Sequence, residues 1–306
     1  MNAYGLKELA EEYFAPHIRD IILKAAEAED PIEELRFCAE RPLAVYKRSG
    51  LSFLGESGNL EKAENAAIIK RCELTALVNS LCENSLYSYQ NQLTAGYVTL
   101  KGGHRAGITG RVITDKGKIT YITDISSVNI RIAKEVKGAA KTVIPYIAGE
   151  GVKSTLIISP PGCGKTTMLR DIARVLGGAS FTYKTAIVDE RGEIAASRLG
   201  VPTNDVGSVT VVLDNCPKTE GMLMLLRSMS PEIIITDEIG TAEDANAVKQ
   251  ILNAGVKVIC SAHGYNREDA MRREGIRELM KAGAFELVVI LSRRSGPGTV
   301  EEIFRV

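Results

Sequence analysis

The sequence predicts an α/β fold for residues 152–306, with a mostly parallel sheet flanked by helices, preceded by a smaller α+β domain over residues 1–128. Two observations predict the α/β fold. Apolar, β-branched runs alternate with helical patterns after Ser154, and a glycine-rich turn joins the first run to the first helix. The candidate strands cover residues 155–159, 185–188, 209–213, 233–236 and 256–261, and residues 285–291 and 300–306 are expected to form a terminal hairpin.

The N-terminal domain is expected to begin with helices and to end in a small sheet. Apolar residues over 6–25 recur close to every 3.6 residues, which is typical of helices. Asp30 before Pro31 resembles a helix N-cap followed by the first helical residue, and Asn59 could cap a further helix over 59–87. Strands are expected at 97–100, 107–113 and 118–122, followed by a connector over 129–151 that contains a helix.

Composition excludes several classes of protein. Lys plus Arg number 38 and Asp plus Glu number 38, so the zero net charge argues against non-specific nucleic-acid binding. Six scattered cysteines form no CxxC pair, which favours a reducing, cytoplasmic environment over a disulfide or zinc framework. No apolar run approaches the roughly 20 residues of a membrane-spanning helix. Any work at a membrane is therefore expected to need a partner protein.

A phosphate-binding loop is predicted between the first strand and the helix that follows. Glycines allow successive main-chain N–H groups to turn towards one anion, and the helix N-terminus adds partial positive charge. Lys165 is expected to neutralise the β- and γ-phosphates of ATP, and the Thr166 hydroxyl to bind Mg²⁺. The usual motif begins with glycine where this chain has serine, which adopts positive φ less readily. The expected nucleotide-binding residues are Ser159, Pro160, Pro161, Gly162, Cys163, Gly164, Lys165, Thr166 and Thr167.

Two acids end the apolar strand over 233–236, and they favour hydrolysis over binding alone. Asp237 is placed to hold Mg²⁺, directly or through water. Glu238 is placed to polarise the attacking water, because a carboxylate can accept the proton of that water. The fold is therefore expected to be that of a P-loop NTPase of the RecA-like type, in which an additional strand and a catalytic glutamate accompany the loop.

Two further strand ends are expected to face the same crevice, because ligands bind beyond the carboxyl ends of strands in open α/β sheets. One strand ends in Asp189, followed by Glu190, Arg191 and Glu193. Glu190 and Glu193 are candidate functional acids, and Arg191 could pair with them or reach the nucleotide. Another strand ends in Ser261 and His263, and we expect His263 to sense the γ-phosphate.

These segments resemble the four boxes of the type II and type IV secretion ATPase superfamily, in the same order. Residues 97–110, 125–138 and 291–298 resemble, more narrowly, the family of stage III sporulation protein AA. The resemblance covers residues 95–306 well and the N-terminal helices weakly. It implies a ring of subunits, expected to number six, in the mother-cell cytoplasm, peripheral to the forespore membrane. An integral-membrane protein of a sporulation channel would dock this ring.

An assembly would also supply an arginine to a neighbouring site, which accelerates phosphoryl transfer by about 10³–10⁵ in other enzymes. Arg105, Arg111 and Arg131 are the candidates. The superfamily places such arginines in or beside the N-terminal domain, and Arg131 lies in the matching region.

Two alternatives to a ring motor stay open from the sequence. The first is a nucleic-acid-dependent ATPase, because basic residues between Lys101 and Arg111 with nearby Tyr97 could contact phosphates. Zero net charge and few aromatic residues count against it. The second is a small-molecule kinase, although adjacent acids suit water activation better and no arginine-rich lid is evident.

Overall fold

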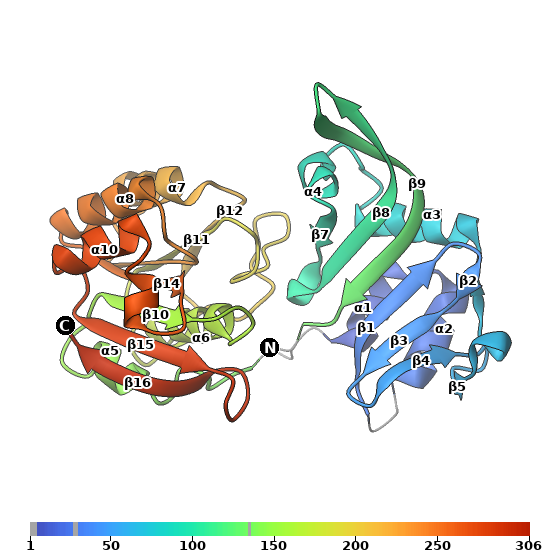
Figure 1. Cartoon of the computed structure of the whole chain (residues 1–306), viewed down its shortest axis with the longest axis horizontal. Helices are drawn as coiled ribbons and strands as arrows, with labels where there is room; N and C mark the ends of the chain where they lie inside the picture. The colour runs from blue at the N-terminus through green and yellow to red at the C-terminus, as the bar shows by residue number, and fades with distance from the viewer. Residues whose placement is uncertain (1–4, 27–29, 134–135) are drawn as a thin grey trace. The chain divides into compact units, whose positions relative to one another are not determined.

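The computed structural model describes residues 5–26, 30–133 and 136–306, and the chain divides into two compact units, 1–134 and 135–306. Each unit is considered by itself (Figure 1). Among the described residues, no helix is long and apolar enough to cross a membrane.

The N-terminal unit has a seven-stranded antiparallel sheet whose core is closed by helices α1 to α3. The strands, in sheet order, are β5 (Leu60–Glu61), β4 (Gly50–Leu54), β3 (Ala44–Lys47), β1 (Ile32–Cys38), β9 (Lys118–Arg131), β8 (Arg105–Asp115) and β7 (Tyr97–Thr99). The helices are α1 (Leu6–Tyr13), α2 (Pro16–Ala25), α3 (Arg71–Leu81) and α4 (Gln90–Thr94), and β2 (Arg41–Pro42) pairs with β6 (Ile68–Ile69).

The helices predicted over 6–25 and the strands predicted at 97–100, 107–113 and 118–122 are present as α1, α2, β7, β8 and β9, but the helix predicted after Asp30 is wrong, and further strands lie between the two groups. Residues after Pro31 form the strand β1, not a helix, because Leu35 and Phe37 bury one face of a strand that pairs with both β3 and β9. The Asp30 carboxylate accepts a hydrogen bond from the Ser49 hydroxyl (2.6 Å) instead of capping a helix. The helix expected over 59–87 is confined to α3, since part of the preceding segment pairs as strands.

The C-terminal unit has a seven-stranded sheet in which five neighbouring pairs are parallel and the last pair is antiparallel. In sheet order the strands are β12 (Val211–Asp214), β11 (Thr185–Asp189), β13 (Ile233–Thr236), β14 (Lys257–His263), β10 (Thr155–Ser159), β15 (Leu287–Ser292) and β16 (Thr299–Arg305). The helices are α5 (Ile144–Ala148), α6 (Lys165–Leu176), α7 (Lys218–Met229), α8 (Ala242–Asn253), α9 (Arg267–Ala270) and α10 (Glu274–Lys281).

Helices cover both faces of this sheet because its strands are apolar on both faces (Figure 1). Along β10, Leu156 and Ile158 pack with α7, α8 and α10, whereas Ile157 packs with α5 and α6. Strand β14 lies between β10 and β13, so one strand separates the predicted phosphate loop from the predicted acidic strand end.

The connector predicted over 129–151 is divided between the two units. Residues 129–131 continue β9, and Val143 and Ile147 are buried in the core of the C-terminal unit. Residues 134 and 135 lie outside the described residues. Apolar side chains that need burial therefore assign most of this segment to the larger unit.

Two carboxylates stand side by side where β11 and β12 end. Asp189 and Asp214 are register partners, and Asp214 Oδ1 is buried without a hydrogen-bond partner among the described residues. Burial, and then the nearby Asp189 charge, raise the pKa of Asp214 from 3.8 to about 6. Ionised Asp214 therefore opposes folding above about pH 6, and this effect fades as the pH falls towards 4.

We predict that Asp214→Asn stabilises the protein at pH 8. The gain should be about 1 kcal/mol, because solvent screens this half-buried group, and it should raise the melting temperature by about 2–4 °C. At pH 4 the variant and the parent should melt together, as monitored by circular dichroism. An equal difference at both pH values would contradict the assigned cause.

Candidate nucleotide-binding site

The loop between β10 and α6 has the backbone of an anion cradle. Gly162 and Gly164 adopt φ of +68° and +88°, which glycine adopts readily. Ser159 is the last residue of β10, is fully buried, and donates its hydroxyl hydrogen bond to the Pro160 carbonyl (2.9 Å). Since Ser159 has the extended conformation of a strand, its place in the motif makes no demand for glycine.

The turn between β15 and β16 supports this loop through main-chain contacts. The Gly298 N–H donates a hydrogen bond to the Cys163 carbonyl (2.9 Å). A Cβ atom on Gly164 would lie 3.0 Å from the Gly298 nitrogen, so only glycine fits without displacing the turn. The hairpin predicted at the C-terminal end therefore buttresses the loop.

The Lys165 side chain is buried, and its ammonium group lies beside the first residues of the loop. Its Nζ lies 3.4 Å from each of the Ser159 and Pro160 carbonyl oxygens and 3.2 Å from His263 Nδ1. Burial lowers the pKa of Lys165, while the charges of Asp237 and Glu238 oppose that shift. A phosphate group here would replace weak carbonyl acceptors with charged oxygens.

Thr166, the second residue of α6, is hydrogen-bonded to the acid that follows β13. The Thr166 hydroxyl donates a hydrogen bond to Asp237 Oδ2 (2.7 Å), and the Ser261 hydroxyl donates to Asp237 Oδ1. These contacts join α6, which follows β10, to the residue after β13 and to Ser261 within β14. They place the Thr166 hydroxyl and the Asp237 carboxylate within hydrogen-bonding distance of each other.

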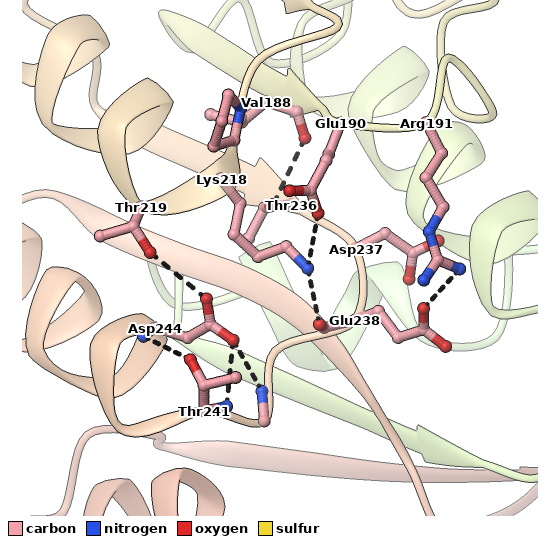
Figure 2. Close-up of polar contacts among 12 residues, drawn as sticks. Val188, Glu190, Arg191, Lys218, Thr219, Thr236, Asp237, Glu238, Thr241 and Asp244 are labelled. Carbon is pink, nitrogen blue, oxygen red and sulfur yellow. Dashed lines mark hydrogen bonds and ion pairs between the residues drawn. The ribbon is translucent and has the colours of Figure 1, made fainter. Parts of the chain in front are cut away.

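Glu238 has an unusual backbone and a fully engaged side chain. Its φ is +53°, a left-handed conformation that is uncommon for residues other than glycine. Its carboxylate pairs with Arg191 (Nη1 to Oε2, 2.7 Å) and with His263 Nε2. Figure 2 shows Arg191 reaching Glu238 from the segment after β11.

His263 bridges two of the predicted residues. The Lys165 ammonium can only donate, so His263 Nδ1 accepts from it and Nε2 carries the proton that faces Glu238. The Arg273 guanidinium donates to the His263 carbonyl (2.5 Å) and fixes the end of β14. His263 therefore connects Lys165 to Glu238.

Asp189, the last residue of β11, is buried, whereas Glu190, which follows it, is exposed. Asp189 is buried and accepts hydrogen bonds from the main-chain N–H groups of residues 193 to 195 (2.8–3.0 Å). Burial nevertheless raises the pKa of Asp189, with the three hydrogen bonds acting in the opposite direction. Glu190 instead pairs with Lys218 (3.0 Å) beside a cavity of about 10 Å³ that Asp237 and Glu238 also line. The Glu193 carbonyl accepts from Arg170 (2.6 Å).

Sequence reasoning missed Lys218 and Arg273. A signal for Lys218 was available, because a lysine at the start of a helix opposes the helix dipole. Arg131 lies in the N-terminal unit, where it pairs with Glu34 (3.5 Å) and is 72% exposed. Arg105 covers the Tyr97 ring at 3.5 Å in the same unit.

The donors present fit Mg²⁺ held jointly with a nucleotide. Among the described residues, no group of three or more His, Cys, Asp or Glu side chains could hold a metal ion. Mg²⁺ commonly takes one or two protein oxygens together with substrate phosphates and water. Thr166 and Asp237 supply that kind of oxygen pair at the N-terminus of α6.

Comparisons with known proteins agree with this fold. A family model described as "Sporulation stage III, protein AA" matches residues 6–306. Stage III sporulation protein AA of Bacillus subtilis (strain 168) is 43% identical over 276 residues, covering 89% of this chain and 86% of that protein.

Two solved structures share the fold. The Legionella pneumophila ATPase DotB superposes with a TM-score of 0.57 at 16% identity, covering 89% of this chain and 74% of that chain. The pilus retraction motor PilT, solved with bound ADP, gives 0.53 at 14% identity, covering 89% and 76%. The α/β ATPase fold is therefore shared, and the match along almost the whole length shows that this chain belongs to the sporulation stage III protein AA family.

Proposed function

We propose that this chain is a Mg²⁺-dependent ATPase that hydrolyses ATP to ADP and phosphate. The observation that carries the proposal is the convergence of Lys165, the Thr166–Asp237 pair and Glu238 at one edge of the sheet. PilT, which has the same fold, was solved with ADP. Thr166 and Asp237 would hold Mg²⁺, whose positive charge would stabilise the charge that develops during phosphoryl transfer.

The chain's own residues divide the work. Main-chain N–H groups of residues 162–166 bind the β- and γ-phosphates, and Lys165 exchanges its carbonyl contacts for phosphate oxygens. Glu238 orients the attacking water and accepts its proton on a carboxylate oxygen. Arg191 is 59% exposed, so its ion pair with Glu238 is weak enough to exchange when water and phosphate arrive.

We further propose that the protein acts as a ring of six subunits, on the mother-cell side of the forespore membrane. An integral-membrane protein of a sporulation channel would dock the ring, which would energise that apparatus. Arg131 supports the assembly, because its exposed guanidinium is available to complete a neighbouring subunit's site.

Two substitutions separate binding from turnover. Lys165→Ala should weaken Mg·ATP binding by about 10- to 100-fold, because a charged hydrogen-bond donor is lost. Glu238→Gln should keep that affinity and lose turnover by at least about 100-fold, because the amide accepts no proton. Isothermal titration and phosphate release without any acceptor measure the two effects.

Glu278→Gln is the matched control, because Glu278 of α10 forms its ion pair with Lys249 of α8. It should behave as the parent in both assays. Turnover near the parent's rate in Glu238→Gln would remove Glu238 from the reaction, and unaltered binding in Lys165→Ala would remove the phosphate loop.

A shared site predicts complementation between two inactive variants. Arg131→Ala should lose assembled turnover by about 10³-fold, whereas Arg48→Ala, another exposed arginine of the same unit, should not. Mixing Arg131→Ala with Glu238→Gln should restore part of the activity, because some interfaces then join an intact Glu238 to an intact Arg131. Full turnover of Arg131→Ala alone would end this assignment.

A further inference from the structure

Lys218 makes two contacts that tie the two acidic segments of the site together. It is the first residue of α7, and its side chain is only 14% exposed. Its Nζ lies 3.0 Å from Glu190 Oε2 and donates a hydrogen bond to the Glu238 carbonyl (2.9 Å). Figure 2 shows the ammonium between these two partners.

The position of Lys218 is unfavourable for the helix that carries it. A cation at a helix N-terminus opposes the helix dipole, and burying its ammonium removes hydration. The N-cap Pro217 provides no side-chain hydrogen bond to offset this. Both contacts of Lys218 are made outside its own helix, with residues of the candidate nucleotide site.

The backbone of Glu238 needs such support. A left-handed glutamate persists only where its surroundings hold it. The Glu238 N–H donates to the Ser261 hydroxyl (3.0 Å), and the Glu238 carbonyl accepts from Lys218. The peptide groups on both sides of this residue are therefore held, and the direction of its carboxylate follows from them.

The residue after Lys218 holds the other end of the same turn. Thr219 Oγ1 donates to Asp244 Oδ1 (3.4 Å), and Asp244 Oδ2 accepts from the N–H groups of Gly240 (3.0 Å) and Thr241 (3.1 Å). Figure 2 shows both connections leaving the start of α7. The beginning of this helix thus braces the turn over 238–241 at two points.

The geometry points to Lys218 as a positioning residue that holds Glu238 in its reacting orientation, with Glu190 acting through Lys218 and not on the nucleotide. Glu190 neutralises the buried ammonium, and the ammonium in turn fixes the Glu238 carbonyl. This inference rests on the proposed hydrolysis of ATP, and it assigns Glu190 an indirect role in that reaction.

The first test compares turnover with binding. Lys218→Met, which keeps the length and apolar stem, should lower kcat by about 100-fold, as small misplacements of reacting groups do. KM for Mg·ATP and affinity for Mg·ADP should stay near the parent values. Affinity for Mg·ADP with aluminium fluoride, which mimics transfer to water, should fall. Lys218→Arg should recover part of the loss, and Lys249→Met, on a half-buried lysine of α8 that pairs with Glu278, is the matched control.

The second test is a double-mutant cycle. If Glu190 acts through Lys218, Glu190→Gln should cost much less in the Lys218→Met background than in the parent. Unaltered kcat and aluminium fluoride affinity in Lys218→Met, or an undiminished effect of Glu190→Gln in that background, would overturn the inference. Should Lys218→Met melt below the parent, the same comparison is made at a temperature at which circular dichroism shows both proteins folded.

Failure of the ATPase proposal would look different. The parent itself would then bind neither Mg·ADP nor the aluminium fluoride complex, and Lys165→Ala would change nothing. A parent that binds and turns over, with Lys218→Met behaving identically, would leave the ATPase in place and remove Lys218 alone.

Discussion

The hydrogen bond between the Thr166 hydroxyl and Asp237 holds the proposed reaction centre together. Strand β14 separates β10 from β13, so residues that follow these two strands meet only by reaching across its end. Ser261 of β14 donates to the same carboxylate and also accepts from the Glu238 N–H. One carboxylate therefore links the phosphate loop to the residue proposed to activate water.

The α/β unit was predictable from the sequence because its strands are buried on both faces. The run over 233–236 and its neighbours contain few polar residues, and the loop glycines occupy the positions at which positive φ occurs. The resemblance to a sporulation family is confirmed by the match over residues 6–306. In the N-terminal unit the first two helices and the last three strands were predictable, whereas the cap signals of Asp30 and Asn59 are overridden by tertiary pairing.

Spacing along the chain identified the acids at the site but not their division of labour. The Asp189 carboxylate accepts hydrogen bonds from three main-chain N–H groups, and Glu190 pairs with Lys218, which is 28 positions away in sequence. The partner of Glu190 is distant in sequence, whereas the three N–H groups that bind Asp189 follow it by four to six residues. The left-handed φ of Glu238 likewise follows from contacts made by Ser261 and Lys218, which a reading of the strand alone does not include.

The central claim is that Glu238 readies a water molecule for attack on a phosphate held by residues 162–166. A crystal structure with Mg·ADP and aluminium fluoride tests it most directly. The account predicts a Glu238 carboxylate oxygen about 2.6–3.2 Å from the water in line with the fluoride plane, with Arg191 displaced from that oxygen. A water held by another residue, with Glu238 still paired to Arg191, would contradict it.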